Sequence, residues 1–131
     1  MQGTRAAILA LVTLAFAATT AMAEPQVPVG RRCFAITQFE TWRAPDPHTM
    51  FIRVGISRVF RIDMASACQA LTWPGSHLIT VWRTSGFVCD AMDWDLKVSN
   101  DVGGPAMPCI VKAQTELTPQ EIAQIPPKYK P

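Results

Sequence analysis

Four cysteines restrict the fold of this 131-residue chain more than any other feature of its sequence. An even number of cysteines in a small exported protein is typical of two disulfides. No two of the four form a C-x-x-C pair, and neither histidine stands at the spacing from a cysteine that zinc sites usually show. We therefore expect two disulfides, no metal and no other cofactor. The four are Cys33, Cys68, Cys89 and Cys109.

The N-terminus predicts export. Arg5 gives a short positive region, residues 6–18 are apolar, and Ala21 and Ala23 are the small residues that a signal peptidase reads. The apolar run is shorter than the ~20 residues that cross a bilayer, and no later segment is apolar enough to span one. We expect cleavage after Ala23, so residues 1–23 are a signal peptide and the product is a soluble periplasmic or extracellular protein.

Length and charge limit the number of domains and the expected partners of the rest of the chain. Residues 24–32 hold two prolines and a glycine, which indicates a flexible leader, and residues 33–131 suit a single domain. The chain has 12 basic and 10 acidic residues, so removal of Arg5 with the signal peptide leaves a net charge of about +1. This balance excludes nucleic acid as an expected partner, because phosphate binding needs a clearly basic surface.

Alternating apolar and polar residues between 51 and 64 give the clearest signal of secondary structure. A period of two is typical of strands with one buried face. The alternation breaks at 55–58, which suits a tight connection. We predict a hairpin with strands near 49–54 and 59–64. Its buried face should carry Ile52, Val54, Phe60 and Ile62.

Short β-branched and aromatic segments separated by turns predict a mainly β (α+β) fold. Pro45 and Pro47 predict a turn at 42–47, and residues 73–76 match a type II turn. We expect a small antiparallel sheet or a partly closed barrel of about six strands, with 78–82 as a central strand. The predicted strands are 33–39, 49–54, 59–64, 78–82, 96–98 and 109–113.

The C-terminal segment predicts a short helix. Thr118 is a good N-cap, Pro119 fits the first helical position, and Glu121 stands three residues after the cap, which together form a capping box. Pro126 and Pro127 should end the helix after about two turns.

Four cysteines allow three pairings, and we favour Cys33 with Cys109 and Cys68 with Cys89. Cys33 and Cys109 each open a predicted strand. The first and last strands of a small closed sheet tend to be neighbours, because this removes exposed edges. Cys68 and Cys89 flank one predicted strand, so a bridge between them would tie the irregular 65–72 segment to the sheet.

Short motifs from Cys33 to Glu121 combine this order of cysteines with a closing Leu-Thr-Pro-x-Glu segment. They are Cys33-Phe34, Trp42-Arg43-Ala44 with Asp46, the hairpin at 51–63, Cys68, Val88-Cys89-Asp90, Cys109-Ile110-Val111 and Leu117-Thr118-Pro119-Gln120-Glu121. In this combination they resemble a family of small exported four-cysteine bacterial proteins that is classed as a domain of unknown function. The resemblance implies export and disulfides, but no catalytic or binding residue. Members often have a lipid-anchored N-terminus, and this chain differs because no cysteine stands at the cleavage point.

Residues with catalytic or metal-binding chemistry are sparse. Four aspartates between Asp90 and Asp101 lack the spacing and the distal glutamate of a calcium loop, so we expect a solvated turn. His48 and His77 have no nucleophile motif near them, and no serine stands in a G-x-S-x-G context.

The candidate surface patch consists of Trp73, Trp94, Arg53 and Arg61. Trp73 precedes a turn and Trp94 stands among aspartates, whereas Trp82 continues an apolar strand and is expected in the core. Arg53 and Arg61 share the polar face of the predicted hairpin, where an ordinary solvent-facing surface is the alternative to an acidic partner.

These features favour a non-enzymatic exported module that binds an unknown protein or an envelope ligand. The second hypothesis is a protein inhibitor of an extracytoplasmic hydrolase that presents a loop at 84–86 or 90–95. It rests by analogy on size, disulfides and β-rich architecture. A small enzyme of unknown class is the third.

Overall fold

The computed structural model describes residues 33–82, 86–100 and 105–131. The predicted signal peptide and leader, and most of the 84–86 loop, lie outside these residues.

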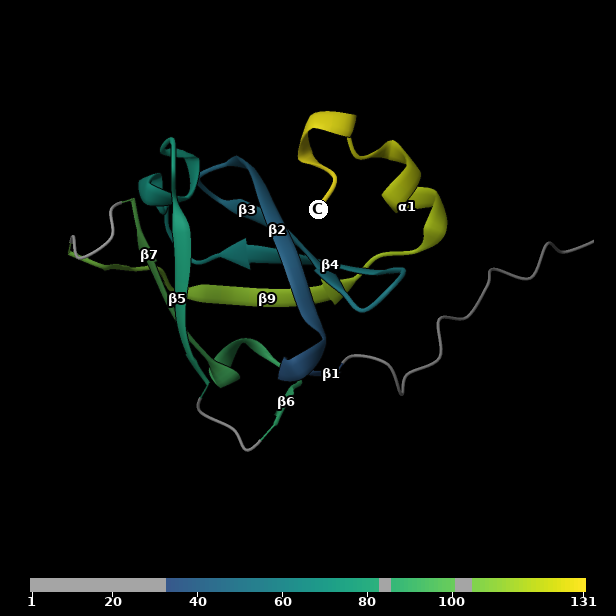
Figure 1. Ribbon diagram of the computed structural model, residues 1–131, viewed down its shortest axis with the longest axis horizontal. Helices are drawn as coiled ribbons and strands as arrows, with labels where there is room; N and C mark the ends of the chain where they lie inside the picture. Colours follow the sequence, from purple (N-terminus) through teal and green to yellow (C-terminus); the bar gives the residue numbers. More distant parts are fainter. Residues whose placement is uncertain (1–32, 83–85, 101–104) are drawn as a thin grey trace, which may run out of the picture.

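The described part contains nine strands, one short α-helix and four 3-10 turns (Figure 1). The strands are β1 (Phe34–Ala35), β2 (Phe39–Asp46), β3 (Thr49–Val54), β4 (Arg58–Met64), β5 (His77–Trp82), β6 (Phe87–Val88), β7 (Trp94–Ser99), β8 (Met107–Pro108) and β9 (Val111–Glu116). The helix is α1 (Pro119–Gln124), and the turns are η1 (Ile36–Gln38), η2 (Gln69–Thr72), η3 (Ala91–Asp93) and η4 (Pro127–Tyr129).

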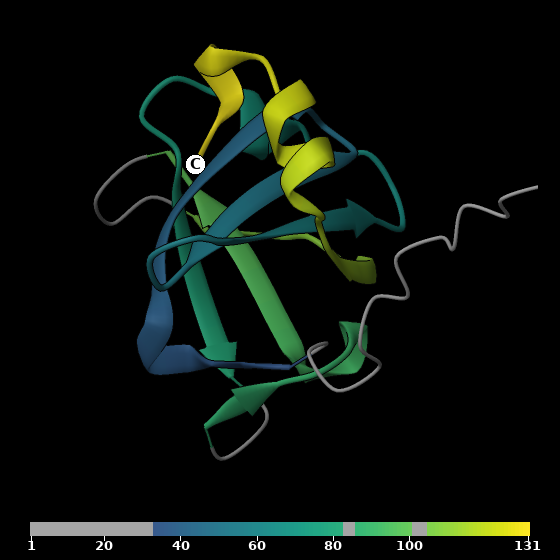
Figure 2. The same ribbon diagram turned by 90° about the vertical axis from the view of Figure 1, so that its right-hand side faces the viewer.

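The strands form three antiparallel sheets. Four strands join in the order β2-β3-β4-β9, three in the order β5-β7-β8, and β1 pairs with β6. The sheets are not closed into a barrel (Figures 1 and 2). The mainly β prediction is confirmed. The sequence predicted about six strands because β6 and β8 have two residues each, too few to show a period, and because a turn was predicted over most of β2. The predicted strand 33–39 is interrupted by η1.

The predicted hairpin is confirmed. Each residue of β3 pairs with one of β4 from Thr49↔Asp63 to Val54↔Arg58, without a register shift. The four residues expected on its buried face are at most 1% exposed. Gly55 adopts a φ of 60° in the connecting turn, a backbone conformation that favours glycine.

The core lies between the two larger sheets. Phe34 packs against Phe60 with ring centroids 5.2 Å apart and against Trp94 with centroids 6.0 Å apart. Leu96 and Val98 of β7 are buried in the same cluster as the inner face of the hairpin. One continuous core therefore holds the two sheets together.

The predicted turn at 42–47 is wrong for residues 42–46, because β2 continues through Pro45 to Asp46, and the turn comes at Pro47 and His48. β2 is an edge strand, so the missing amide of a proline removes no bond that the sheet needs. The pairing with β3 also shifts between Arg43 and Asp46, which accommodates the ring. Pro45 therefore marks a sheet edge, whereas Pro47 does lie in the turn between β2 and β3.

β5 is an edge strand of its sheet, and the prediction of a central strand at 78–82 is wrong. A run of apolar residues indicates burial on both faces, yet Ile79 is 39% exposed. The type II turn before this strand is confirmed, since the amide of Ser76 donates to the carbonyl of Trp73 and Gly75 has a φ of 77°.

The predicted disulfide pairing is wrong, because Cys33 bonds to Cys89 and Cys68 bonds to Cys109. β1 pairs with β6 rather than with β9, and the pair Phe34↔Val88 brings Cys33 beside Cys89. After β4 the chain turns toward the start of β9, where the amide of Ala65 donates to the carbonyl of Ile110. This turn brings Cys68 to Cys109.

The predicted C-terminal helix and its capping box are confirmed. The hydroxyl of Thr118 accepts from the amide of Glu121 at 3.3 Å, and the Glu121 carboxylate accepts from the amide of Thr118 at 2.7 Å. α1 lies on the side of the four-stranded sheet away from β5 and β7 (Figures 1 and 2). Val59 and Ile125 are both buried outside the main core cluster, and the amide of Leu117, just before α1, donates to the carbonyl of Val59 at 2.8 Å.

Candidate functional site

A pocket of about 400 Å³ lies where β2, the 71–76 segment and η4 meet. Its volume is at the small end of the range for ligand sites. We call it the aromatic pocket, because three of its lining side chains are aromatic. The lining residues are Trp42, Arg43, Ala44, Pro45, Leu71, Thr72, Trp73, Gly75, Ser76, Lys128 and Tyr129.

β2 supplies one wall of the aromatic pocket. Trp42 pairs with Ile52 on the inner face of the sheet and packs, half-buried, against the core. Arg43 points to the opposite face and is exposed, and one of its guanidinium nitrogens donates to the carbonyl of Trp42 at 2.9 Å. A guanidinium has five N–H donors, so further donors remain for a ligand.

The 73–76 turn supplies the second wall. The Ser76 hydroxyl donates to the carbonyl of Trp73 at 2.7 Å and also contacts the carbonyl of Ala70. These bonds hold the turn against η2 and leave Trp73 40% exposed. A large aromatic ring on a fixed turn is suited to bind another flat or apolar surface.

η4 supplies the third wall, close to the C-terminus. The amide of Tyr129 donates to the carbonyl of Pro126 at 2.8 Å, which closes the turn. The Lys128 ammonium lies 5.1 Å from the centre of the Tyr129 ring, within the range of a cation–π interaction. η4 contacts β2, so this turn is placed against the first wall.

The aromatic pocket combines apolar faces with positive charge. Arg43 and Lys128 contribute two cations, and none of the described residues that line the pocket carries a carboxylate. A ligand with an apolar or flat part and a negatively charged group matches this surface, since a guanidinium binds a carboxylate through paired hydrogen bonds.

The structure does not bring the four predicted patch residues together. Trp73 lines the aromatic pocket, but Trp94 is only 6% exposed, so its prediction as a surface residue is wrong. Its ring packs on Phe34, and its indole nitrogen donates to the Gln114 side chain at 2.9 Å. A tryptophan among aspartates was misleading, because Trp94 opens a strand whose alternate residues face the core.

Arg53 and Arg61 are both exposed on the polar face of the hairpin, as predicted, but outside the aromatic pocket. Arg53 pairs with Val59 across the ladder, and Arg61 pairs with Phe51. The Arg61 guanidinium donates to the Asp63 carboxylate at 2.8 Å. Arg61 is therefore already engaged in an ordinary surface ion pair.

Sequence reasoning missed the C-terminal residues of the aromatic pocket. Tyr129 is the one tyrosine of the chain and stands two residues after Pro127, and no role was predicted for it. Lys128 and Trp42 gave no distinct signal, because the pocket joins three segments that lie far apart in the sequence. An aromatic residue beside a lysine next to a proline turn was the available hint.

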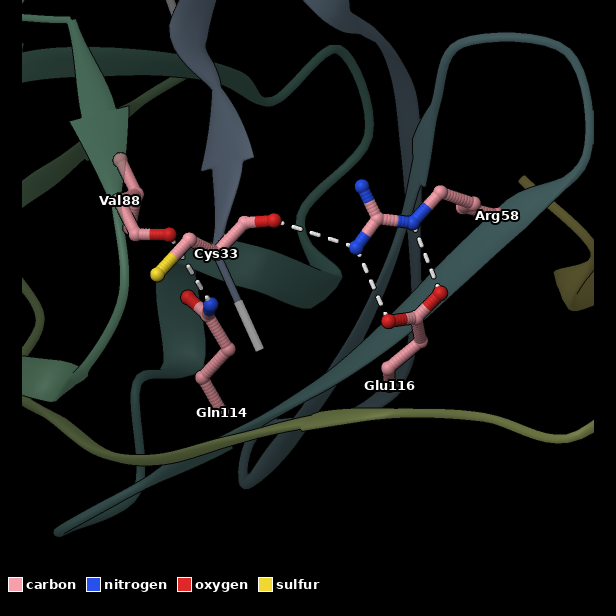
Figure 3. Close-up of polar contacts among 5 residues, drawn as sticks. All are labelled: Cys33, Arg58, Val88, Gln114 and Glu116. Atoms are coloured by element: carbon pink, nitrogen blue, oxygen red, sulfur yellow. Dashed lines mark hydrogen bonds and ion pairs between the residues drawn. The ribbon is translucent and has the colours of Figure 1, made fainter. Parts of the chain in front are cut away.

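A second polar cluster is structural. Arg58 donates to both oxygens of the Glu116 carboxylate, at 2.7 and 2.9 Å, and to the carbonyl of Cys33 at 3.1 Å (Figure 3). The hydrogen bond with Glu116 and its negative charge raise the pKa of Arg58, while burial acts in the opposite direction. In the same view, the Gln114 amide donates to the carbonyl of Val88 at 3.5 Å. This cluster ties β4 and β9 to the start of β1.

Asp90 and Asp93 belong to a turn, as expected, whereas Asp95 lies in β7. The Asp93 carboxylate accepts from the amide of Cys89 at 2.7 Å, and the Asp90 carboxylate accepts from the amide of Met92 at 2.8 Å. Asp95 lies 4.0 Å from the Lys97 ammonium. The carboxylates of Asp90 and Asp93 cap the turn that contains η3. Asp101 lies outside the described residues. Within the described ranges, no group of three side chains is placed to hold a metal ion.

His48 and Asp63 line one hollow together with Arg61 and Lys112. One oxygen of the Asp63 carboxylate accepts from Arg61 at 2.8 Å, so this carboxylate takes part in a surface ion pair. The described lining of this hollow contains no serine or cysteine nucleophile. The aromatic pocket is therefore the stronger site.

No helix in the described ranges is long and apolar enough to cross a membrane. Comparisons with protein-family models, with curated proteins and with solved structures give no match to the chain.

Proposed function

We propose that this chain is an exported, non-enzymatic binding module and that its ligand occupies the aromatic pocket. The observation that carries the proposal is the meeting of three aromatic rings and two cations in one pocket with no carboxylate in its described lining. Such a surface binds through apolar contact and charge and needs no reacting group.

Export is supported by the N-terminal pattern and by the two disulfides. The pattern before Glu24 is that of a cleaved signal peptide. Disulfides persist in oxidising compartments and are rare in the cytosol. The resemblance to small exported four-cysteine proteins agrees with the same proposal. N-terminal sequencing of the protein from a fractionated cell should find Glu24 as the first residue, whereas an unprocessed cytoplasmic protein would contradict it.

The inhibitor hypothesis receives no support from the described loop. Residues 91–93 form a 3-10 turn, whereas a substrate-like inhibitor presents an extended segment. We therefore place the binding surface in the aromatic pocket.

Binding should depend on Trp73. Wild-type protein, Trp73→Ala and the control Met92→Ala can be compared on arrays of anionic oligosaccharides and of random short peptides. Met92 is 83% exposed and lies outside the aromatic pocket, so its loss removes apolar surface without touching the site. We expect Trp73→Ala to weaken binding about tenfold or more, since buried aromatic anchors dominate binding energy, and Met92→Ala to have little effect. Equal binding by all three proteins would contradict the proposal.

A further inference from the structure

Among the described strands, β5 is an edge strand whose own sequence and pairing carry none of the usual devices against strand addition. It pairs with β7 over six consecutive residues without a register shift. Its sequence, His-Leu-Ile-Thr-Val-Trp, contains no charged residue and no proline and is rich in β-branched and aromatic residues. A regular apolar edge of this kind is a ready template for an added strand.

The other long edge strands of the described sheets carry protection. β2 contains Pro45 and irregular pairing, and it contacts η2 and η4. β9 carries Lys112 and contacts η3. Proline, irregular pairing, lysine and covering turns are the devices by which proteins block edge pairing. Within the described residues, β5 contains no proline, no lysine and no register shift, which distinguishes its edge from those of β2 and β9.

The aromatic pocket lies at the beginning of β5. The wall formed by Trp73, Gly75 and Ser76 leads directly into His77, the first residue of the strand. Figures 1 and 2 show β2 beside β5 on the side away from β7, and within the described residues no ladder joins β2 to β5, so this edge of β5 faces β2 without being paired to it. A chain bound along β5 therefore reaches the pocket at the N-terminal end of the strand.

We propose that the ligand is an extended, acidic peptide segment of a partner protein, which adds to β5 as a fourth strand of the three-stranded sheet and places a carboxylate in the aromatic pocket. This inference rests on the proposed function. The edge of β5 offers alternating backbone donors and acceptors, which another peptide backbone matches and a sugar does not. Arg43 and Lys128 supply the positive charge that selects an acidic residue.

The same charges disfavour a second copy of this chain as the occupant. Two copies paired along β5 would place one β5 beside the pocket of the other, and this strand contains no acidic residue to meet Arg43 and Lys128. The partner must therefore bring a different strand.

The test begins with a random library of linear peptides displayed on phage and selected on the immobilised protein. We expect the selected peptides to share an acidic residue next to alternating apolar residues. A synthetic peptide of the selected sequence should bind about tenfold more weakly to Lys128→Glu. The control Arg53→Glu reverses the charge of an exposed arginine outside the pocket and should bind as wild type does.

Hydrogen exchange then separates strand addition from simple occupation of the pocket. Saturation with the peptide should protect alternate amides of β5, because only the amides that face the open edge gain partners. Peptide binding that requires Trp73 but leaves the exchange of β5 unchanged would overturn strand addition and leave the proposed function standing.

Binding of anionic oligosaccharides without any selected peptide would overturn the peptide ligand. Concentration-dependent protection of β5 without peptide would assign the edge to a second copy instead, and loss of all binding would overturn both proposals.

Discussion

Arg58 connects three parts of the chain that lie far apart in the sequence. It stands at the start of β4, bonds both carboxylate oxygens of Glu116 in β9, and reaches the carbonyl of Cys33. Its guanidinium also lies 4.9 Å from the centre of the Phe60 ring. A lysine could not reproduce this geometry, because only the planar guanidinium offers paired donors together with a flat face.

Arg58→Ala should destabilise the domain by about 2 kcal/mol, since a partly buried carboxylate would lose its charged hydrogen bonds. Arg61→Ala is the matched control, because it removes an exposed ion pair worth no more than about 1 kcal/mol. Urea denaturation with the disulfides intact measures both. A larger effect of Arg61→Ala would contradict the role assigned to Arg58.

Substitution of Val54 tests which face of the hairpin is buried. It is 1% exposed and faces the core, while its neighbour Arg53 is exposed. Val54→Asp should cost several kcal/mol because it buries an unpaired charge, whereas Arg53→Asp should stay within about half a kcal/mol. Equal midpoints of chemical denaturation for the two variants would show that the register of β3 is different.

The elements differ in how far the sequence predicts them. The hairpin at 51–64 and the cap at Thr118 depend on residues close together in the chain, so alternation and capping preferences suffice to predict both. The strand through Pro45 was not predictable, because it depends on β2 lying at the edge of a sheet. The position of β5 at an edge depends in the same way on which strands assemble beside it.

The candidate site was predictable only in part. Trp73 was identified because it precedes a turn that the sequence itself specifies. Tyr129 and Lys128 join it through the path of the chain after α1, and the sequence does not encode that path locally. Trp94 was misplaced because burial of a strand's first residue depends on the sheet that packs against it.

The cap of α1 should contribute measurably to stability. Thr118→Ala removes the hydroxyl that accepts from the Glu121 amide and should cost about 1 kcal/mol. Gln120→Ala changes an exposed helical residue without a capping role and serves as the control. Thermal unfolding measures both, and equal melting temperatures would show that the cap does not stabilise the domain.

The same cap should make stability depend on pH. Hydrogen bonds from the Thr118 amide and hydroxyl lower the pKa of Glu121 in the folded state. A carboxylate whose pKa is lowered on folding adds stability above its unfolded pKa, and this contribution is lost as pH falls through the folded pKa. The difference in melting temperature between wild type and Glu121→Gln should therefore shrink on acidification. A difference that grows in acid would reverse the assignment.

At the scale of the whole molecule, the two disulfides covalently link segments that lie outside the strands. Cys33–Cys89 fastens the β1–β6 pair, and Cys68–Cys109 joins the segment after β4 to the segment before β9. For loops of 56 and 41 residues, the chain-entropy model gives each bridge roughly 4 kcal/mol. This is comparable to the total stability of a small domain.

Peptide mapping without reduction should recover Cys33 joined to Cys89 and Cys68 joined to Cys109. These pairs follow from the pairing of β1 with β6 and from the turn after β4. A peptide joining Cys33 to Cys109 would mean that β1 lies beside β9, which would contradict the topology of the whole domain.

The two bridges overlap along the chain, because Cys68 lies between Cys33 and Cys89, and Cys89 lies between Cys68 and Cys109. A single proteolytic cut anywhere between Cys33 and Cys109 therefore leaves the two fragments joined by at least one bridge, and a cut between Cys68 and Cys89 leaves them joined by both. A protease that nicks a surface loop in this interval produces a two-chain molecule rather than two products. Outside the cytoplasm, where little reductant is present, the nicked domain remains one covalent unit.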